Sequence, residues 1–268
     1  MNLLTFKMNF LNWESYRRLS MLLVVWSLLL HTSMVSQGKY LPKTIICSNP
    51  NHLIKDTIQL EYDWANRITR INSKTGGQRG QENRFETKIS YNEDGMVASL
   101  IETPLSNGSS PTLEYRFGYS GRFLDKIWFN QGAGEEMANV QYSAPTNTYN
   151  VDYKGTWQNF VFEDGDLVAS RIKGYEVFAI HRDKEAGPGV LIHIKDNLPI
   201  MMVTQTLGGS QLVWYVLANH QVDLLVLNDQ NIFISTKRDE FGRIAQIDFA
   251  MDELGTYQTT TIDYKTLK

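Results

Sequence analysis

The sequence predicts an all-β protein, an antiparallel meander of hairpins that forms a curled sheet or a soluble up-and-down barrel. Three observations support this prediction. Short stretches alternate between apolar and polar residues, as strands with one buried face do. Asparagine or glycine follows these stretches where a hairpin turn needs a left-handed backbone. The same pattern recurs from residue 58 almost to the C-terminus.

The N-terminal region is of a different kind. Basic residues precede an apolar run of twelve, Leu19–Leu30, and small residues follow it, which is typical of a secretory signal peptide. A bilayer-spanning helix needs about 20 apolar residues, so this run is short for one, and an uncleaved anchor is the alternative. We therefore expect residues 1–37 to be a signal peptide and residues 38–268 to be a single all-β domain. The chain is then exported to the periplasm, cell surface or extracellular space, and only the signal segment would enter a membrane.

The single cysteine, Cys47, lies well beyond the apolar run, so the sequence does not indicate a lipid anchor. One thiol cannot form an intramolecular disulfide, and no histidine pattern activates it. We expect Cys47 to be buried and inert.

Charge limits the class of partner. Without its first 36 residues the chain keeps 23 of 26 basic and 28 of 29 acidic residues, a net charge of −5. Phosphate binding needs clustered lysine and arginine, and the chain has no basic stripe. Nucleic acid is therefore not an expected partner.

The clearest hairpin is Ile58–Ile71 (IQLEYDWANRITRI). Its first half places Ile58, Leu60, Tyr62 and Trp64 on one face, which predicts that Trp64 lies in the core. Asn66 occupies the turn, and an apolar return strand follows. Copies of this hairpin lie at Tyr91–Leu100, Tyr119–Phe123, Phe162–Leu167 and Arg238–Ile247. The predicted turn residues are Asn66, Gly95, Gly121, Gly165 and Gly242.

The form Tyr-Asp-x-x-Asn/Gly-Arg-Ile/Leu-x-x-Ile, seen from Tyr62 to Ile71 and in part from Phe241 to Ile247, resembles the YD/RHS-type hairpin repeat. Together with the signal peptide, it resembles the secreted and lipoprotein families of Bacteroidetes that carry such hairpins. The resemblance covers roughly residues 51–268. It implies an antiparallel barrel of porin-like form that is soluble. Repeat spacing is irregular, which argues against a propeller or solenoid.

Further strands follow in order. Clean alternation predicts strands at Phe85–Tyr91 and Leu113–Tyr119, and Tyr149–Tyr153 is expected to pair with Trp157–Phe162 across Lys154-Gly155-Thr156. Apolar runs of strand length follow at Tyr175–Ile180, Val190–Ile194, Ile200–Thr204, Leu212–Leu217, Val222–Leu227 and Ile232–Thr236, and the last strands are Ile244–Met251 and Thr260–Tyr264. Most alternating runs span only five to seven residues, whereas transmembrane barrel strands need about 9–11, so a membrane barrel is the less favoured reading.

Catalytic and metal-binding patterns are missing from the sequence. Its histidines have no ligand-like spacing, and His181 and His193, the nearest to a cluster, lie at strand ends. The acidic pairs Glu135-Glu136 and Asp164/Asp166 are expected to lie in solvated turns, not across a catalytic cleft. No nucleophile elbow or phosphate-binding glycine loop is present. We expect no metal, no cofactor and, on balance, no enzymatic activity.

Aromatic residues are the best candidates for binding. Trp128, Trp157 and Trp214 are the predicted ligand-contacting residues, as a stacking platform for glycans or a surface for lipids. The sequence thus predicts an exported, non-catalytic binding or scaffold module of the cell envelope, whose ligand is unknown. Two alternatives stay open: a hydrolase acting on glycans or peptides, and a carrier of an apolar ligand inside the barrel.

Overall fold

The computed structural model describes residues 40–49, 54–76, 82–106, 111–130, 132, 134–188, 220–227, 230–251 and 255–266. Residues 42–264 form one compact unit, which carries the fold described below. Of the second unit, residues 1–41 and 265–268, only the first two residues of β1 and two residues near the end of β16 are described. The predicted signal peptide, the three apolar runs between 190 and 217, Trp214 and His193 lie outside the described residues.

Sixteen strands and one short 3-10 helix, η3, make up the regular structure of the described residues. The strands are β1 (Tyr40–Asn49), β2 (Ile54–Tyr62), β3 (Ile68–Gly76), β4 (Glu82–Tyr91), β5 (Val97–Pro104), β6 (Leu113–Ser120), β7 (Phe123–Asn130), β8 (Glu135–Ser143), β9 (Thr148–Tyr153), β10 (Thr156–Glu163), β11 (Asp166–Ile172), β12 (Tyr175–Pro188), β13 (His220–Leu227), β14 (Gln230–Arg238), β15 (Ile244–Met251) and β16 (Gly255–Thr266), with η3 at Ala144–Thr146. No helix in the described part of the chain has the length and apolar content to cross a bilayer.

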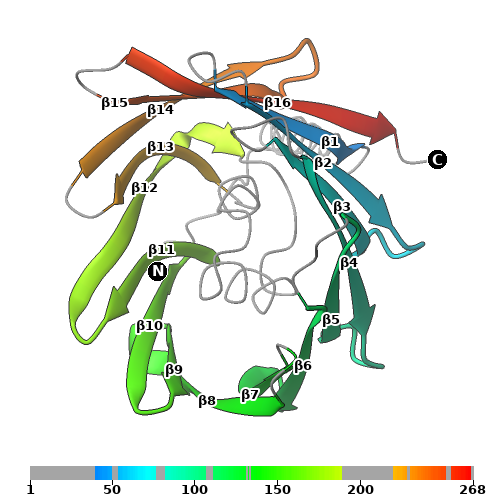
Figure 1. Cartoon of the computed structure of the whole chain (residues 1–268). Coiled ribbons are helices and arrows are strands. Elements are labelled where there is room, and N and C mark those ends of the chain that lie inside the picture. The colour runs from blue at the N-terminus through cyan, green and yellow to red at the C-terminus, as the bar shows by residue number, and fades with distance from the viewer. Residues whose placement is uncertain are drawn as a thin grey trace, which may run out of the picture. The chain divides into compact units, whose positions relative to one another are not determined.

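The strands form a closed barrel in which each strand lies beside its neighbours in sequence (Figure 1). Consecutive strands pair antiparallel, for example Trp157 opposite Asp152 across the Lys154-Gly155 turn, as predicted. The ring closes because β1 lies next to β16. The predicted fold class is confirmed, and of its two forms the closed up-and-down barrel is the one observed.

Side chains of β1 and β16 join the two ends of the ring. The Cys47 thiol lies 3.2 Å from the Thr260 hydroxyl in the buried interior, and the Ser48 hydroxyl donates to the Thr259 carbonyl at 3.3 Å. Burial raises the pKa of the Cys47 thiol to about 12, because it disfavours the thiolate. Cys47 therefore fills space at the seam of the barrel and is not an activated nucleophile.

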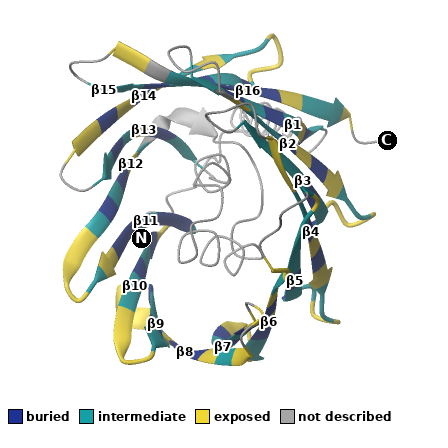
Figure 2. Ribbon diagram, in the orientation of Figure 1, coloured by how far each residue is buried: buried dark blue, intermediate teal, exposed yellow. Residues whose placement is uncertain are grey.

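One face of the sheet carries the hydrophobic core. On β4 Thr87 and Ile89 are buried whereas Lys88 and Ser90 are exposed, and a similar alternation occurs on β6 and β14 (Figure 2). Tyr115 and Phe160 are among the largest side chains that are almost fully buried. Burying an apolar side chain of this size stabilises the fold by about 1.5–3 kcal/mol. The apolar side chains of this face are buried, so the face lies toward the protein interior.

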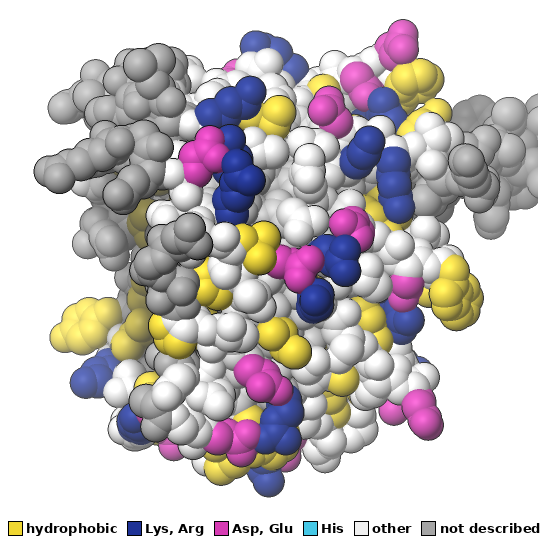
Figure 3. Space-filling model, turned by 45° about the vertical axis from the view of Figure 1, so that its right-hand side comes forward, with side chains coloured by type: hydrophobic (Ala, Val, Ile, Leu, Met, Phe, Trp, Pro, Cys, Tyr) yellow, Lys and Arg dark blue, Asp and Glu magenta, His cyan; other side chains and the backbone are white. Residues whose placement is uncertain are grey.

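The opposite face of β2–β4 carries paired charges. Arg70 lies between Glu61 on β2 and Glu86 on β4, at 3.4 and 3.2 Å, and Glu86 also pairs with Lys88 at 3.1 Å. Figure 3 shows charged side chains of both signs spread over this side of the molecule. A charge on a lipid-facing strand costs about 2–4 kcal/mol near the bilayer midplane. This face is therefore suited to water.

Strands extend beyond the residues that alternate cleanly. They span 6 to 14 residues, and β3 continues through the polar stretch Asn72–Gly76 because each of these residues pairs with β4. Backbone hydrogen bonds to both neighbours extend the strand where its side chains give no periodic signal.

Candidate functional site

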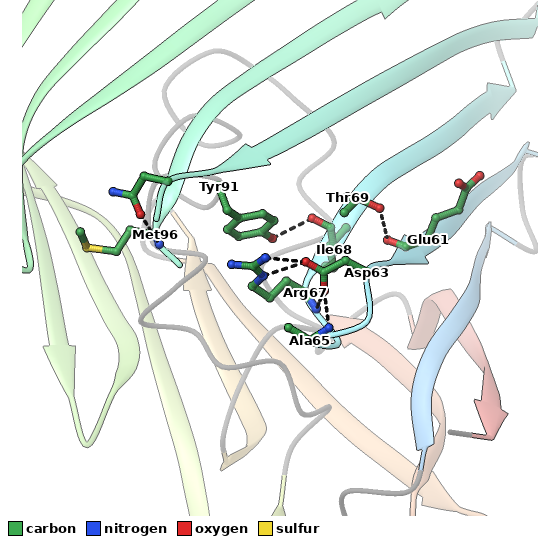
Figure 4. Close-up of polar contacts among 9 residues, drawn as sticks. Glu61, Asp63, Ala65, Arg67, Ile68, Thr69, Tyr91 and Met96 are labelled. Atoms are coloured by element: carbon green, nitrogen blue, oxygen red, sulfur yellow. Dashed lines mark hydrogen bonds and ion pairs between the residues drawn. The ribbon is translucent and has the colours of Figure 1, made fainter. Parts of the chain in front are cut away.

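The turn between β2 and β3 is held by an aspartate and an arginine. The Asp63 amide donates to the Arg67 carbonyl at 2.9 Å, and the Asn66 amide donates to the Asp63 carbonyl at 3.1 Å. The Asp63 carboxylate accepts hydrogen bonds from the amides of Ala65 and Arg67, both at 2.9 Å, and from the Arg67 guanidinium at 2.8 Å (Figure 4). The left-handed Asn66, with φ of 63°, completes the reversal. Five residues thus form a rigid turn with few free polar groups.

The turn between β14 and β15 repeats this arrangement. The Asp239 carboxylate accepts from the amides of Phe241 and Arg243, both at 3.0 Å, and from the Arg243 guanidinium at 2.7 Å. Gly242, with φ of 75°, takes the position of Asn66. The β4–β5 turn shares the aspartate-type contact, since Asn92 Oδ1 accepts from the Met96 amide at 2.8 Å. The sequence pattern Asp-x-x-Asn/Gly-Arg thus corresponds to one recurrent turn.

Asp63 and Asp239 are held ionised by these contacts. Burial works to raise the pKa of each carboxyl group, but the hydrogen bonds and positive charge of the arginine four residues later outweigh it. The pKa of each carboxyl therefore lies below its ordinary value, and both turns are stabilised by charge at neutral pH.

A tyrosine packs against the arginine of each turn. It lies on the strand that follows the return strand, β4 in the first copy and β16 in the second. The Arg67 guanidinium lies 4.3 Å from the centre of the Tyr91 ring, and the Tyr91 hydroxyl donates to the Ile68 carbonyl at 2.7 Å. In the second copy the Arg243 guanidinium lies 4.7 Å from the Tyr264 ring, whose hydroxyl donates to the Ile244 carbonyl at 2.8 Å. The aspartate, arginine and tyrosine therefore act as one unit that joins two hairpins.

The same tyrosine contact occurs on two further strands, β2 and β6. Tyr62 donates to the Pro42 carbonyl at 2.6 Å, and Tyr119 donates to the Val97 carbonyl at 2.8 Å. Together with Tyr91 and Tyr264, they lie at or near the ends of β2, β4, β6 and β16, and their rings pack against the core. Burial raises the pKa of Tyr62 and of Tyr264 well above the ordinary value. We call the four residues Tyr62, Tyr91, Tyr119 and Tyr264 the tyrosine belt.

All five predicted turn residues have a left-handed backbone. Their φ values are 63° for Asn66, 80° for Gly95, 61° for Gly121, 86° for Gly165 and 75° for Gly242. Sequence reasoning missed Lys173-Gly174, a further turn in which both residues have positive φ. The dipeptide Lys-Gly between two alternating runs was the available signal, because this turn type needs positive φ twice.

Exposed aromatic side chains lie at the tips of the two arginine turns. Trp64 is 92% exposed and Phe241 is 57% exposed. The prediction that Trp64 belongs to the core is wrong. A bulge at Glu61/Tyr62 shifts the register, and β2 ends at Tyr62, so Trp64 belongs to the turn and no longer follows the strand alternation.

The predicted binding tryptophans do not form one platform. Trp128 on β7 packs over Gly118, where an added Cβ would lie 2.8 Å from its ring, and the Arg116 guanidinium lies 5.7 Å from the ring centre. Trp157 on β10 is partly exposed, but β8 and β9 lie between the two residues. Three strand spacings separate them by about 14 Å. Trp214 lies outside the described residues, so the described part of the predicted set gives two separate aromatic sites.

The two acidic pairs have different environments. Glu135 and Glu136 are the first two residues of β8, so their expected position in a turn is wrong, but they do lie at the surface and pair with Arg116 and Lys154. The expected solvated position of Asp166 is also wrong, because its side chain is 1% exposed. His220 Nδ1 lies 2.6 Å from Asp166 Oδ2, which also accepts from the His220 amide at 3.1 Å.

Arg182 completes this buried polar cluster. Its side chain is 4% exposed, its Nε lies 3.7 Å from Asp166 Oδ2, and its guanidinium donates to the carbonyls of Leu167 at 2.9 Å and His220 at 3.2 Å. Burial lowers the pKa of Arg182, and the Asp166 charge opposes that shift. Arg182 continues the buried phase of Phe178 and Ile180, a signal that sequence reasoning missed. The cluster links β11, β12 and β13.

Its contacts are those of a structural ion pair. Arg182 donates to two backbone carbonyls, although its buried Nε has no hydrogen-bond partner among the described residues, and the contacting oxygen of Asp166 accepts from His220. His220 is the only partly exposed member of the three. Within the described ranges, no group of three or more His, Cys, Asp or Glu side chains is arranged to hold a metal ion.

Comparisons with known proteins give a fold-level similarity only. No protein-family model matches the sequence, and no curated protein matches it. Among solved structures, a porin-like protein from Bacteroides uniformis ATCC 8492 aligns with a TM-score of 0.39 and 13% identity, covering 84% of this chain and 98% of that chain. A porin-like protein from Bacteroides vulgatus ATCC 8482 aligns with a TM-score of 0.35 and 11% identity, covering 84% of this chain and 99% of that chain.

Proposed function

We propose that this chain is an exported β-barrel protein of the cell envelope that acts as a non-catalytic binding or scaffold module. The signal-peptide pattern supports export. The closed barrel, with buried apolar side chains and paired charges on the outer face of β2–β4, supports a domain that faces water. The polar clusters of the described residues are engaged in turns and strand contacts, which supports a structural role for them.

The observation that carries the binding proposal is Trp64. A side chain of this size that is 92% exposed contributes nothing to the core, and its turn is fixed by the Asp63 contacts. An aromatic residue held on a rigid turn loses little entropy on binding, and tryptophan is enriched at binding hot spots. Phe241 is likewise exposed, and it lies on the β14–β15 turn, which the Asp239 contacts fix. We infer that the end of the barrel that carries the β2–β3 and β14–β15 turns, with Trp64 and Phe241, contacts the partner.

Glycans and lipids are the partner classes that fit these residues. Aromatic faces stack on the apolar faces of sugar rings or insert among lipid headgroups. Arg243 lies 4.8 Å from the Phe241 ring centre, but its charge is paired with Asp239 at 2.6 Å. We propose a neutral envelope glycan as the first partner class and an acyl chain as the second.

A carrier of an apolar ligand is the second candidate function. Barrels of 16–18 strands enclose more space than a small barrel fills with side chains, and in membrane porins that space is a polar channel. Here the buried face carries apolar residues such as Ile45, Leu60 and Phe160, which are at most 5% exposed. A guest that contacts them would be apolar and would have to replace the protein that shields these side chains.

The recurrent turn supports the proposed relationship to YD/RHS-like hairpin proteins of Bacteroidetes. In both arginine turns of this chain the aspartate accepts hydrogen bonds from turn amides and the arginine contacts a later tyrosine. Asp63, Arg67 and Tyr91 supply these contacts in one copy, and Asp239, Arg243 and Tyr264 supply them in the other.

Binding of the purified protein to a glycan array and to lipid vesicles tests the proposal. We expect Trp64→Ala to reduce binding at least tenfold, since loss of a hot-spot side chain costs about 2 kcal/mol or more. Tyr175→Ala, a change at an 80% exposed aromatic residue at the start of β12, is the matched control and should leave binding unchanged. Bound acyl chains recovered by solvent extraction would favour the carrier, and turnover of a bound glycan would contradict the non-catalytic assignment.

A further inference from the structure

The outer face of β10–β15 differs from that of β2–β4. Residues directly opposite each other on paired strands share a face. One row on the outer face contains Val161, Ala169, Ala179 and Val226, on β10 to β13, and ends at Asn231 on β14. The next row contains Leu224, Phe233 and Ala250, on β13 to β15, and ends at His181 on β12. Charged residues are missing from these two rows, whereas β2–β4 carry a network of ion pairs; the nearest carboxylate is the exposed Asp223, in the β13 bulge beside Leu224.

Polar rows border the apolar rows on both sides. One polar row lies beside the row of Ala179, on the side toward the start of β12. It contains Asn159 and the ion pair Arg171–Glu176, at 3.6 Å. A second polar region lies on the other side, next to the row of Phe233 and Ala250. It contains Ser235 and the ion pair Lys237–Asp248, at 3.6 Å. An apolar centre inside a polar, solvent-accessible rim is the composition of a protein–protein interface.

Large and small side chains lie side by side in the apolar rows. Phe233 projects from β14 and is 44% exposed, whereas Ala179 on β12 is short and half-buried and forms a shallow alanine floor; Ala169, opposite it on β11, is buried, with 6% of its surface exposed. The point midway between the aromatic ring and that floor lies on β13, at Leu224 and Val226. A two-fold axis through this point places Phe233 of each copy on the alanine floor of the other, which is the reciprocal contact that an isologous dimer requires.

The area of this face determines the affinity that we expect for the dimer. Six strands spaced about 4.8 Å apart and four rows of same-face residues about 6.7 Å apart cover about 500 Å² per copy. A standard interface buries about 800 Å² per partner, and interfaces below it belong to weak, reversible complexes. We propose that the outer face of β10–β15 binds the same face of a second copy of this chain, forming a reversible two-fold dimer with Phe233 and Ala179 in reciprocal contact.

Sedimentation of the purified full chain over a concentration series to about 100 μM tests the dimer, because weak complexes are populated in that range. We expect the wild type to dimerise reversibly and Phe233→Lys to weaken dimerisation at least tenfold. Met137→Lys is the matched control, since Met137 is 45% exposed on the outer face of β8, and it should dimerise as the wild type does. A monomer at every concentration, or equal loss in both variants, would overturn the proposal.

A cross-linking variant keeps the test decisive if Phe233→Lys does not fold. Leu224→Cys places a thiol near the proposed axis, and Cys47 is buried and does not compete for oxidation. We expect a disulfide-linked dimer under mild oxidation that reverts on reduction, and no such species from Met137→Cys. Equal cross-linking of both variants, or of neither, contradicts this two-fold arrangement.

Discussion

The Tyr91 hydroxyl donates a 2.7 Å hydrogen bond to the Ile68 carbonyl, directly after the arginine whose guanidinium lies over the same ring. One tyrosine thereby fixes both the turn and the first residue of the neighbouring return strand. Because Tyr62, Tyr119 and Tyr264 make the same carbonyl contact, the tyrosine belt sets the relative position of successive hairpins at this end of the barrel.

Removing one belt hydroxyl should destabilise the fold without changing its packing. Tyr91→Phe keeps the ring over Arg67 and removes the bond to Ile68. We expect the free energy of unfolding in urea to fall by about 1 kcal/mol, the net contribution of one such hydrogen bond. Tyr175→Phe is the control, because Tyr175 is strongly exposed, and it should match the wild type. Equal stability of all three proteins would show that the belt contacts contribute nothing.

The two arginine turns should lose stability in acid. The folded-state pKa of Asp63 and of Asp239 is depressed, so their contribution is complete above the unfolded pKa of about 3.9 and is lost as pH falls through the lower folded pKa. We expect Asp63→Asn to reduce the free energy of unfolding by about 1–2 kcal/mol at pH 7. That difference from the wild type should shrink below about pH 4. A difference independent of pH would contradict the assigned charge.

The buried ion pair predicts strong coupling between two positions. Arg182→Met leaves Asp166 buried beside His220 without its guanidinium, and removing one partner of a buried pair costs about 3–5 kcal/mol. Replacing both residues with apolar ones, Asp166→Leu with Arg182→Met, should cost less than the sum of the two single changes. A double-mutant cycle from urea unfolding measures the coupling. Additive losses would mean that the two side chains do not interact.

Gly118 and Trp128 give a test of the outer face. An added Cβ at Gly118 meets the Trp128 ring at 2.8 Å, whereas at Gly121 it meets nothing within 4 Å but has to adopt φ of 61°. We expect both alanine variants to lose about 1–2 kcal/mol, by overpacking in one and backbone strain in the other. Only Gly118→Ala should also change tryptophan fluorescence, because only this substitution displaces the indole. Unchanged fluorescence would place the Trp128 ring elsewhere.

Most of the fold could be predicted from local sequence patterns. Strand alternation and turn residues such as Asn66 and Gly165 depend on neighbouring residues in the chain, so the sequence shows them directly. Barrel closure is not, because it depends on the pairing of β1 with β16, more than 200 residues apart, and no local pattern encodes Cys47 beside Thr260. Trp64 was misplaced because alternation was read past the end of the strand. Asp166 was misplaced because its partners Arg182 and His220 come from distant strands.

Closure of the ring is the claim on which the other inferences rest, and hydrogen exchange followed by mass spectrometry in detergent-free buffer tests it most directly. In a closed barrel every strand has two neighbours, so the amides of β1 and β16 should be protected as strongly as those of β4 or β7. Rapid exchange confined to β1 and β16 would reveal two free sheet edges and contradict the closed barrel.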